Sequence, residues 1–234
     1  MNKTLSLTDK LLPDQPLNNE YYGGSDYHRD LYELIASSTG LTPASEAFTL
    51  ALSDKFTIEE MASNPVQLRL LELFVRLVGA TRVLEIGAFI GLSAMTMARA
   101  MPAGGKLITI EKFDHFAEIC RRNIAANGLT DRIDVLDGDA FDVIGRFPSD
   151  ARFDLAFIDG NKERYVDYFR LVEPLVRPGG LILVDDVLFH GDALNATPKT
   201  AKGEGVQAFM RLAAGLGNLR AVLPVCNGLM VIHK

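Results

Sequence analysis

Short apolar runs alternate with amphipathic stretches through most of this chain, and this alternation limits the possible folds more than any other feature of the sequence. Five runs have the length of strands and are apolar on both faces: residues 82–86, 106–110, 133–136, 154–158 and 181–184. Four amphipathic stretches with helical spacing separate them: residues 92–100, 116–126, 140–147 and 165–176. This order predicts βαβ units, which build an α/β fold with a mostly parallel sheet and helices on both of its faces.

The end of the chain has a different pattern. We expect a further helix over residues 206–214, and residues 219–225 and 229–233 are strand-like. Asn227-Gly228 joins the two strand-like runs, and Asn-Gly between apolar runs is a strong hairpin signal. The sequence therefore predicts a Rossmann-like sheet of seven strands that closes with an antiparallel hairpin, which is not the usual end of a nicotinamide-binding domain.

The amino-terminal part of the chain is less regular. Residues 1–27 are polar and contain several prolines and glycines, which is typical of a loosely ordered arm. Helices are expected over residues 28–38 and 43–52, and Asn64-Pro65 is a good start for a third helix. We therefore divide the chain into an arm with helices, residues 1–57, and a main domain, residues 58–234.

The composition argues against several classes of protein. The formal net charge is −6, which disfavours a large phosphate-binding face and therefore a nucleic-acid partner. No apolar run approaches the ~18 residues of a membrane-spanning helix, and the first residues do not resemble a signal peptide. Cys120 and Cys226 lie far apart and match no metal-binding spacing, so we expect reduced thiols. A cytoplasmic protein with no membrane partner is expected.

A glycine turn follows the first predicted strand and indicates a ligand without phosphates. Gly87 and Gly91 are spaced as Gly-x-x-x-Gly, which lacks the glycine that lets a pyrophosphate approach the backbone in Gly-x-Gly-x-x-Gly. Ser93, in the first turn of the next helix, could bind a carboxylate together with free amides. Glu111, at the end of the second strand, could accept hydrogen bonds from two ribose hydroxyls, and Ala140 could pack against an adenine edge. A tight turn without a ligand is the alternative interpretation of the glycines.

Carboxylates follow the fourth and fifth predicted strands. Asp159 comes directly after the fourth strand, and Asp185 and Asp186 come directly after the fifth. If these strands are neighbours, the three side chains converge, and oxygen ligands of this kind favour Mg²⁺, Mn²⁺ or Ca²⁺. Lys162 lies three residues after Asp159, and a nearby dication would lower the pKa of its ammonium and make it a candidate general base. The alternatives are carboxylates that only cap a loop and a solvated lysine.

With these residues the chain resembles the cation-dependent O-methyltransferases, which include catechol and caffeoyl-coenzyme A O-methyltransferases and bacterial relatives. The resemblance covers residues 58–234. It rests on Met61-Ala-Ser63-Asn-Pro65, Leu84-Glu-Ile-Gly-Ala-Phe-Ile-Gly-Leu-Ser93, Ile110-Glu111, Gly138-Asp-Ala140, Phe157-Ile-Asp159-x-x-Lys162, Gly179-Gly180, Val184-Asp185-Asp186 and Leu223-Pro-Val-Cys-Asn-Gly228. Many methyltransferases share the glycine turn, whereas the motifs after strands four and five are more specific to this family.

The resemblance implies an S-adenosylmethionine methyltransferase fold and methylation of one of two vicinal hydroxyls on a small, catechol-like aromatic acceptor. It implies contacts to S-adenosylmethionine from Ser63, Glu85, Gly87, Ala88, Ser93, Glu111, Ala140 and Asn161. It implies that Asp159, Asp185 and Asp186 bind a divalent cation, and that Asp159 and Lys162 are catalytic, with Lys162 as the base. The family is commonly dimeric and its amino-terminal segment often shapes the acceptor pocket, so we expect a homodimer in which residues 1–57 serve these purposes.

Two departures from the family pattern leave other interpretations open. The last cation ligand is usually Asn, and Asp186 adds a negative charge, from which we expect tighter cation binding or a different preferred cation, with weaker activation of the acceptor. Leu92 stands where the family usually has Tyr. A methyltransferase of a hydroxylated tRNA base and a non-catalytic S-adenosylmethionine-binding protein are the alternatives; an oxidoreductase that uses a nicotinamide cofactor is disfavoured by the glycine spacing.

Overall fold

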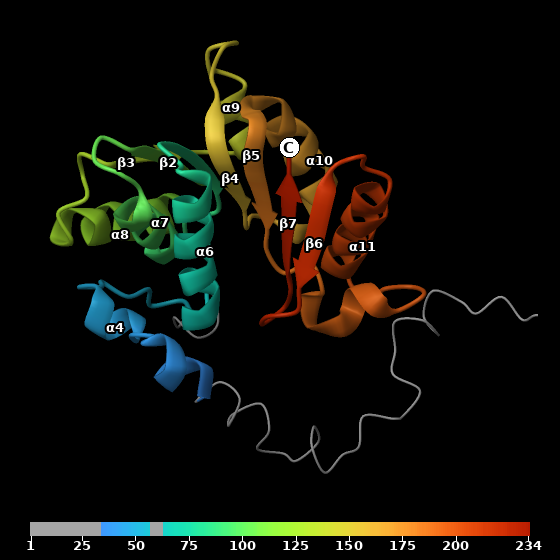
Figure 1. The fold of residues 1–234 in the computed structure, drawn as a ribbon, viewed down its shortest axis with the longest axis horizontal. Coiled ribbons are helices and arrows are strands. Elements are labelled where there is room, and N and C mark those ends of the chain that lie inside the picture. The colour runs from blue at the N-terminus through green and yellow to red at the C-terminus, as the bar shows by residue number, and fades with distance from the viewer. Residues whose placement is uncertain (1–33, 57–62) are drawn as a thin grey trace, which may run out of the picture. The chain divides into compact units, whose positions relative to one another are not determined.

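The computed structural model describes residues 34–56 and 63–234, and the chain divides into two compact units, Met1–Thr42 and Pro43–Lys234. In the first unit, residues 34–39 are helical. The remainder of the predicted arm and helix before residue 34 lies outside the described residues, as do Met61 and Ala62 of the first family motif. The second unit contains the complete sheet (Figure 1).

The sheet has seven strands in the order β3-β2-β1-β4-β5-β7-β6. The strands are β1 (Arg82–Ile86), β2 (Lys106–Glu111), β3 (Ile133–Asp137), β4 (Phe153–Ile158), β5 (Val176–Val184), β6 (Leu219–Leu223) and β7 (Leu229–His233). The first five pair in parallel, and β7 runs antiparallel to both β5 and β6. This confirms the predicted sheet and its terminal hairpin. The chain order reverses between β1 and β4, and open α/β sheets bind ligands at the carboxyl ends of the strands beside such a reversal.

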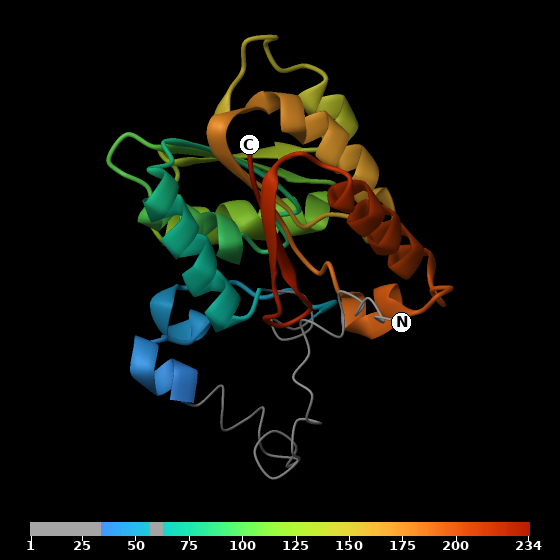
Figure 2. The ribbon, with the colours of Figure 1, turned by 45° about the vertical axis from the view of Figure 1, so that its right-hand side comes forward.

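Helices cover both faces of the sheet, as Figure 2 shows. The principal helices are α6 (Pro65–Val78), α7 (Leu92–Ala100), α8 (Asp114–Ala126), α9 (Ala140–Ile144), α10 (Tyr165–Val172) and α11 (Ala201–Ala214). One core joins α6, α7 and α8 to the sheet, and a second core joins α9, α10 and α11 to the opposite face. Strand β4 shows the period of two that this requires: Leu155 and Phe157 enter the first core, and Ala156 and Ile158 the second. Within the described residues, no helix is long and apolar enough to cross a membrane.

The helix predicted over residues 43–52 is wrong after its first turn. Only α4 (Ala44–Ala47) is helical; Phe48 is extended, and residues 49–53 have no regular secondary structure. Two asparagines explain this, Asn123 in α8 and Asn127 directly after it, because their side chains pair with the backbone as a neighbouring strand would. The Asn127 side chain accepts from Thr49 N at 3.1 Å and donates to Thr49 O at 2.8 Å, and Asn123 pairs with Ala51 in the same way.

Strand β5 is longer than the prediction of residues 181–184, since it begins at Val176. Correspondingly, the helix predicted over residues 165–176 ends at Val172 and is followed by a 3₁₀ turn, Glu173–Leu175. Pro174 lies in this turn, and proline cannot continue an α-helix because it lacks an amide hydrogen and crowds the preceding turn.

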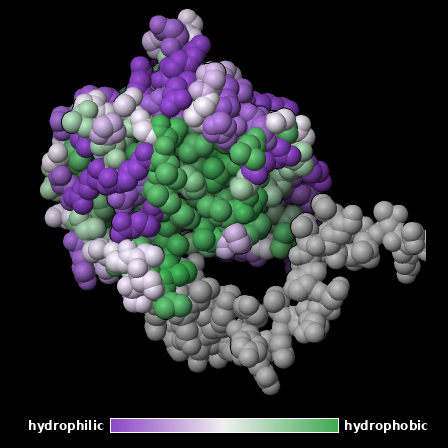
Figure 3. All heavy atoms as spheres, viewed as in Figure 1, coloured by the Kyte–Doolittle hydropathy of each residue, from purple (hydrophilic) through white to green (hydrophobic). Residues whose placement is uncertain are grey.

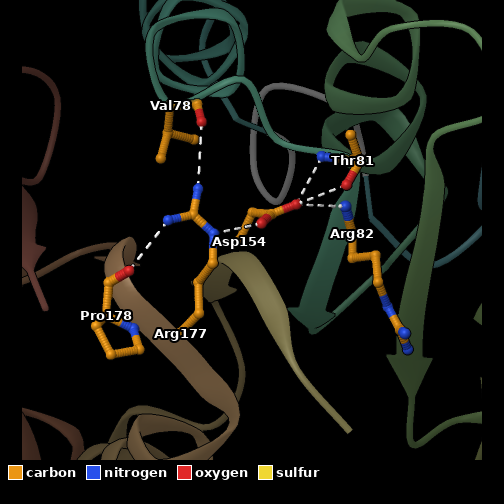
Figure 4. Close-up of polar contacts among 6 residues, drawn as sticks. All are labelled: Val78, Thr81, Arg82, Asp154, Arg177 and Pro178. Carbon is orange, nitrogen blue, oxygen red and sulfur yellow. Dashed lines mark hydrogen bonds and ion pairs between the residues drawn. The ribbon is translucent and has the colours of Figure 1, made fainter.

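A partly buried ion pair joins the amino ends of three neighbouring strands (Figure 4). Asp154 of β4 accepts hydrogen bonds from the amides of Thr81 and Arg82 at 2.7 and 2.9 Å, and from Arg177 Nε of β5 at 2.6 Å. Burial raises the pKa of Asp154, but the Arg177 guanidinium and the amides outweigh it and hold the pKa at about 2. These bonds hold the amino ends of β1, β4 and β5 together, at the edge of the sheet opposite to their carboxyl ends.

Candidate active site

The predicted site residues lie at the carboxyl edge of the sheet, where the strand ends are bonded laterally. The Asp159 amide, directly after β4, donates to Ile86 O of β1 at 2.9 Å. The Asp185 amide, directly after β5, donates to Ile158 O of β4 at 3.0 Å. The three adjacent strands β1, β4 and β5 therefore end next to one another, and the residues that follow them lie at the same edge of the sheet.

Three carboxylates converge at this edge. Asp159, Asp185 and Asp186 each offer a carboxylate oxygen, and these oxygens all lie within 4.8 Å of one another. We call these residues the acidic cluster. Lys162 Nζ is 2.6 Å from Asp159 Oδ1 and 3.0 Å from Asp186 Oδ2. The three aspartates therefore converge as their positions after the strands predicted, and Lys162 is in direct contact with two of them.

The charges of this cluster are only partly compensated. Burial and the neighbouring carboxylates raise the pKa of Asp185 well above its usual range; burial also raises the pKa of Asp159, although Lys162 opposes this. Burial by itself would lower the pKa of Lys162, but Asp159 and Asp186 outweigh it and raise the pKa well above its usual value. In this arrangement Lys162 is a protonated counter-ion, and a role as base requires that its carboxylate partners be engaged elsewhere.

Asp186 adopts a left-handed backbone conformation, with φ of +53°. Among residues other than glycine, Asn and Asp tolerate this conformation best, since their short polar side chains can bond locally. Asn, which the resemblance leads us to expect at this position, would suit the same backbone, so Asp186 differs from it mainly in charge.

Both glycines of the turn over residues 87–91 are required by close contacts. A β-carbon on Gly87, whose φ is +98°, would lie 2.4 Å from Asp159 O. A β-carbon on Gly91, whose φ is +88°, would lie 2.7 Å from Cys120 Sγ. These contacts explain why glycine is needed at both positions, whether or not the turn binds a ligand. The first contact also places the glycine turn directly against the acidic cluster.

Glu111 holds the glycine turn through its carboxylate. Oε2 accepts from Phe89 N at 2.9 Å and from Ala88 N at 3.2 Å, and Oε1 accepts from Phe113 N at 2.9 Å. The side chain is buried at the end of β2. A carboxylate has about four lone-pair positions, so accepting two ribose hydroxyls, as predicted, would require at least one amide to leave.

Glu85 is completely buried and does not line the small cavity beside the glycine turn. Its Oε2 accepts a short hydrogen bond from the Thr109 hydroxyl, and among the described residues its Oε1 has no hydrogen-bond partner. Burial raises the pKa of Glu85 to about 7, against the opposing effect of the neighbouring Ser93 and Thr109 hydroxyls.

The remaining predicted cofactor residues divide into two groups. A small cavity is lined by Ser63, Gly87, Ala88, Phe89, Leu92, Ser93 and Asp159. Ala140 and Asn161 lie outside this lining. Ala140 is the buried first residue of α9, and Asn161 is exposed and caps the 3₁₀ turn Lys162–Arg164 by accepting from Glu163 N at 3.3 Å.

Tyr165 also lies beside the acidic cluster, and sequence reasoning did not select it. Its side chain is fully buried at the start of α10, and Lys162 Nζ lies 5.7 Å from the centre of its ring. A tyrosine in the apolar stripe of a helix looks like a core residue. The sequence feature that could have identified Tyr165 as a site residue was its position three residues after Lys162.

Comparisons with known proteins show the family of this chain. The O-methyltransferase family model matches residues 45–234. A catechol O-methyltransferase from Niastella koreensis is 33% identical over 211 residues, 88% of this chain and 90% of that protein. One from Mycobacterium tuberculosis is 35% identical over 161 residues, 69% and 72% of the two chains. The crystal structure of the O-methyltransferase TomG from Streptomyces achromogenes, in complex with SAM, superposes with a TM-score of 0.74 at 29% identity and covers 94% of this chain and all (100%) of that one. The chain therefore belongs to the family of S-adenosylmethionine-dependent O-methyltransferases.

Proposed function

We propose that this O-methyltransferase requires a divalent cation and methylates one of two vicinal hydroxyls on a small aromatic acceptor, with S-adenosylmethionine as the methyl donor. The observation that carries the proposal is the acidic cluster, whose ligand atoms lie within 4.8 Å of one another, and in which the backbone of Asp159 packs against Gly87 of the glycine turn. The names of the relatives from Niastella koreensis and Mycobacterium tuberculosis support a catechol-like acceptor.

The residues of the acidic cluster fit a hard divalent cation. All three offer oxygen, the ligand that Mg²⁺, Mn²⁺ and Ca²⁺ prefer. Three carboxylates beside the single ammonium of Lys162 give 3 − 1 = 2 uncompensated negative charges if all ionise, the charge that a dication neutralises. When bound, such a cation supplies Lewis acidity that favours ionisation of an acceptor hydroxyl. We propose Mg²⁺ as the native cation, with Mn²⁺ and Ca²⁺ as the alternatives.

The glycine turn and the neighbouring strand ends are the proposed cofactor site. Ser93 and the free amides at the start of α7 suit the carboxylate of the methionine moiety. Glu111 could accept hydrogen bonds from the two ribose hydroxyls if it gave up the hydrogen bond from one amide of the glycine turn. The complete set proposed to contact the cofactor is Ser63, Glu85, Gly87, Ala88, Ser93, Glu111, Ala140 and Asn161.

Lys162 is the proposed base. In the transfer, a lone pair of the acceptor oxygen forms the bond to the methyl carbon, and the pair of the sulfur–carbon bond stays on sulfur. The hydroxyl proton passes to Lys162 Nζ, which must be neutral to accept it. Asp159 and Asp186 stabilise the ammonium, so Lys162 can act in this way only when these carboxylates are bound to another cation. Most of the rate gain comes from in-line positioning of the two reactants.

We further propose a cytoplasmic homodimer in which residues 1–57 contribute to the acceptor pocket or the dimer contact. A broad hydrophobic area lies on the face shown in Figure 3. Exposed apolar side chains include Leu73 and Leu77 of α6 and Leu219 of β6. Contiguous exposed apolar area commonly marks an interaction surface, here proposed to bind a second copy. Light scattering of the full chain tests this, because a monomer at all concentrations would contradict it.

Methyl transfer to catechol in the presence and absence of Mg²⁺ tests the proposed function. We expect turnover that a chelator abolishes and added Mg²⁺ restores. Asp159→Ala should remove most activity and leave the affinity for S-adenosylhomocysteine, measured by calorimetry, largely intact. Asp167→Ala is the matched control, since it removes a half-exposed aspartate from nearby α10. Chelator-insensitive turnover, or equal loss of activity and cofactor affinity in Asp159→Ala, would contradict the proposal.

A further inference from the structure

The Tyr165 hydroxyl is a buried polar group that the packing of the core does not explain. The side chain has no exposed area, and within residues 34–56 and 63–234 its hydroxyl finds no hydrogen-bond partner. Its ring packs edge to face against Phe209 with 6.0 Å between the ring centres, a contact that phenylalanine could make equally well. Leaving a buried hydroxyl unpaired costs about 1–3 kcal/mol, so the oxygen requires a reason beyond packing.

The surroundings of this hydroxyl are charged. Lys162 Nζ lies 5.7 Å from the ring centre, and all three carboxylates of the acidic cluster act electrostatically on the phenol. Burial raises the pKa of Tyr165 well above its usual value; Lys162 opposes this, and the carboxylates add to it. Lys162 Nζ itself lies 2.6 Å from Asp159 and 3.0 Å from Asp186, so the phenol hydroxyl, a hydrogen-bond donor, lies in the neighbourhood of carboxylate acceptors.

We propose that Tyr165 is a positioning residue of the cation site, whose hydroxyl donates a hydrogen bond to the acidic cluster when a cation is bound. This inference rests on the proposed function, because it presumes that the cluster binds a cation. Lys162 now donates to Asp159 and forms an ion pair with Asp186. A dication competes with Lys162 for these carboxylates, so their remaining lone pairs need another donor. Carboxylates that bind metals are themselves held by hydrogen bonds from neighbouring groups, and such bonds fix their orientation.

The affinity for Mn²⁺, measured by calorimetry and by electron paramagnetic resonance on the full chain, tests the inference. We expect Tyr165→Phe to weaken Mn²⁺ binding about 10- to 100-fold, the usual effect of removing a hydrogen bond to a metal ligand. The midpoint of thermal unfolding in a chelator should remain unchanged or rise, because the variant removes a buried hydroxyl that has no partner in the cation-free chain. A structural role for the hydroxyl would instead lower this midpoint.

Two control variants separate the hydroxyl from the ring and from the helix. Tyr168→Phe removes a phenol hydroxyl from the same helix, where the ring stacks on Phe141 with centres 5.2 Å apart, and should leave Mn²⁺ affinity unchanged. Phe209→Leu loosens the packing of the Tyr165 ring but keeps the hydroxyl, and should lower stability more than Mn²⁺ affinity.

The outcomes distinguish this inference from the proposed function. If the unmodified chain binds Mn²⁺ and Tyr165→Phe binds it equally well, the inference is wrong and the proposed function stands. If the unmodified chain does not bind Mn²⁺, or Asp159→Ala binds it as tightly as the unmodified chain, both are wrong. Weaker binding by Tyr165→Phe with an unchanged or raised unfolding midpoint supports both.

Discussion

Gly87 lies so close to Asp159 that a β-carbon at the glycine would be 2.4 Å from the aspartate's carbonyl oxygen. This contact joins the turn proposed to hold the cofactor to the first residue of the acidic cluster. The two proposed sites thus share one backbone contact, and a change at Gly87 should affect both.

Gly87→Ala should weaken binding of S-adenosylhomocysteine and of Mn²⁺ together, each about tenfold or more. The new methyl group must displace the backbone of residues 159–160, and the φ of +98° adds strain of about 1–2 kcal/mol for any residue with a side chain. Calorimetry with each ligand gives the measurement. Gly104→Ala is the control, because Gly104 also has a positive φ but no atom within 4 Å of the added carbon. Unchanged affinity for either ligand in Gly87→Ala would argue against the shared contact.

Asp186→Asn should restore the family's usual residue without disturbing the backbone, since Asn accepts the left-handed conformation. The variant removes one negative charge, so we expect Mn²⁺ affinity to fall about tenfold, or about 1.4 kcal/mol. Turnover of catechol at saturating cation should rise, because fewer charges on the ligands leave a stronger Lewis acid. Titration of activity and of binding with Mn²⁺ separates the two effects. Asp186→Ala, which removes the ligand, should lower both; equal cation affinity in Asp186→Asn and the unmodified chain would contradict the charge argument.

Glu85→Gln should make the stability of the cation-free chain less dependent on pH. The pKa of Glu85 is raised from 4.5 to about 7 in the folded chain, so its favourable contribution is complete below pH 4.5 and is lost as pH rises through 7. The loss is on the order of 3 kcal/mol for a fully buried group. The variant should therefore gain stability relative to the unmodified chain between pH 5 and pH 8, measured as urea midpoints.

Glu118→Gln, on the exposed face of α8, is the control for this pH series, and no such trend is expected there. A difference between Glu85→Gln and the unmodified chain that is the same at every pH would mean that Glu85 does not hold a proton near neutral pH.

The sequence predicted the parts of the fold and the site that follow from local pattern. Apolar runs located the strands, and Asn227-Gly228, in which Gly228 has a φ of +86°, indicated the hairpin. The strand predicted over residues 219–225 ends at Leu223, however, so the connection is residues 224–228 and not the two residues Asn227-Gly228 alone. Because parallel strands end at one edge, residues directly after β4 and β5 could be placed together. Asp159 and Asp185 could therefore be predicted to lie together although they are far apart in the sequence.

The parts that sequence reasoning missed depend on contacts between distant segments. Residues 49–51 are not helical because Asn123 and Asn127 bind their backbone, and no local pattern encodes a pairing across more than seventy residues. Three of the four acceptor positions of Glu111 are used for amides of residues 88, 89 and 113, a use that the strand-end position alone did not indicate.

Asp154→Asn should destabilise the chain by about 2–3 kcal/mol at pH 7. The Asp154 carboxylate accepts hydrogen bonds from four donors, and the NH₂ group of an asparagine would itself face some of these donors. The pKa of Asp154 is lowered from 3.8 to about 2, so its contribution is present above pH 3.8 and is lost as pH falls through 2. The deficit of the variant should therefore be constant from pH 7 to about pH 5 and shrink below pH 4. Urea denaturation at each pH measures it, with the exposed Asp134→Asn of β3 as control. A deficit that persists undiminished at pH 3 and below would show that hydrogen-bond geometry, not the charge facing Arg177, holds the amino ends of the strands together.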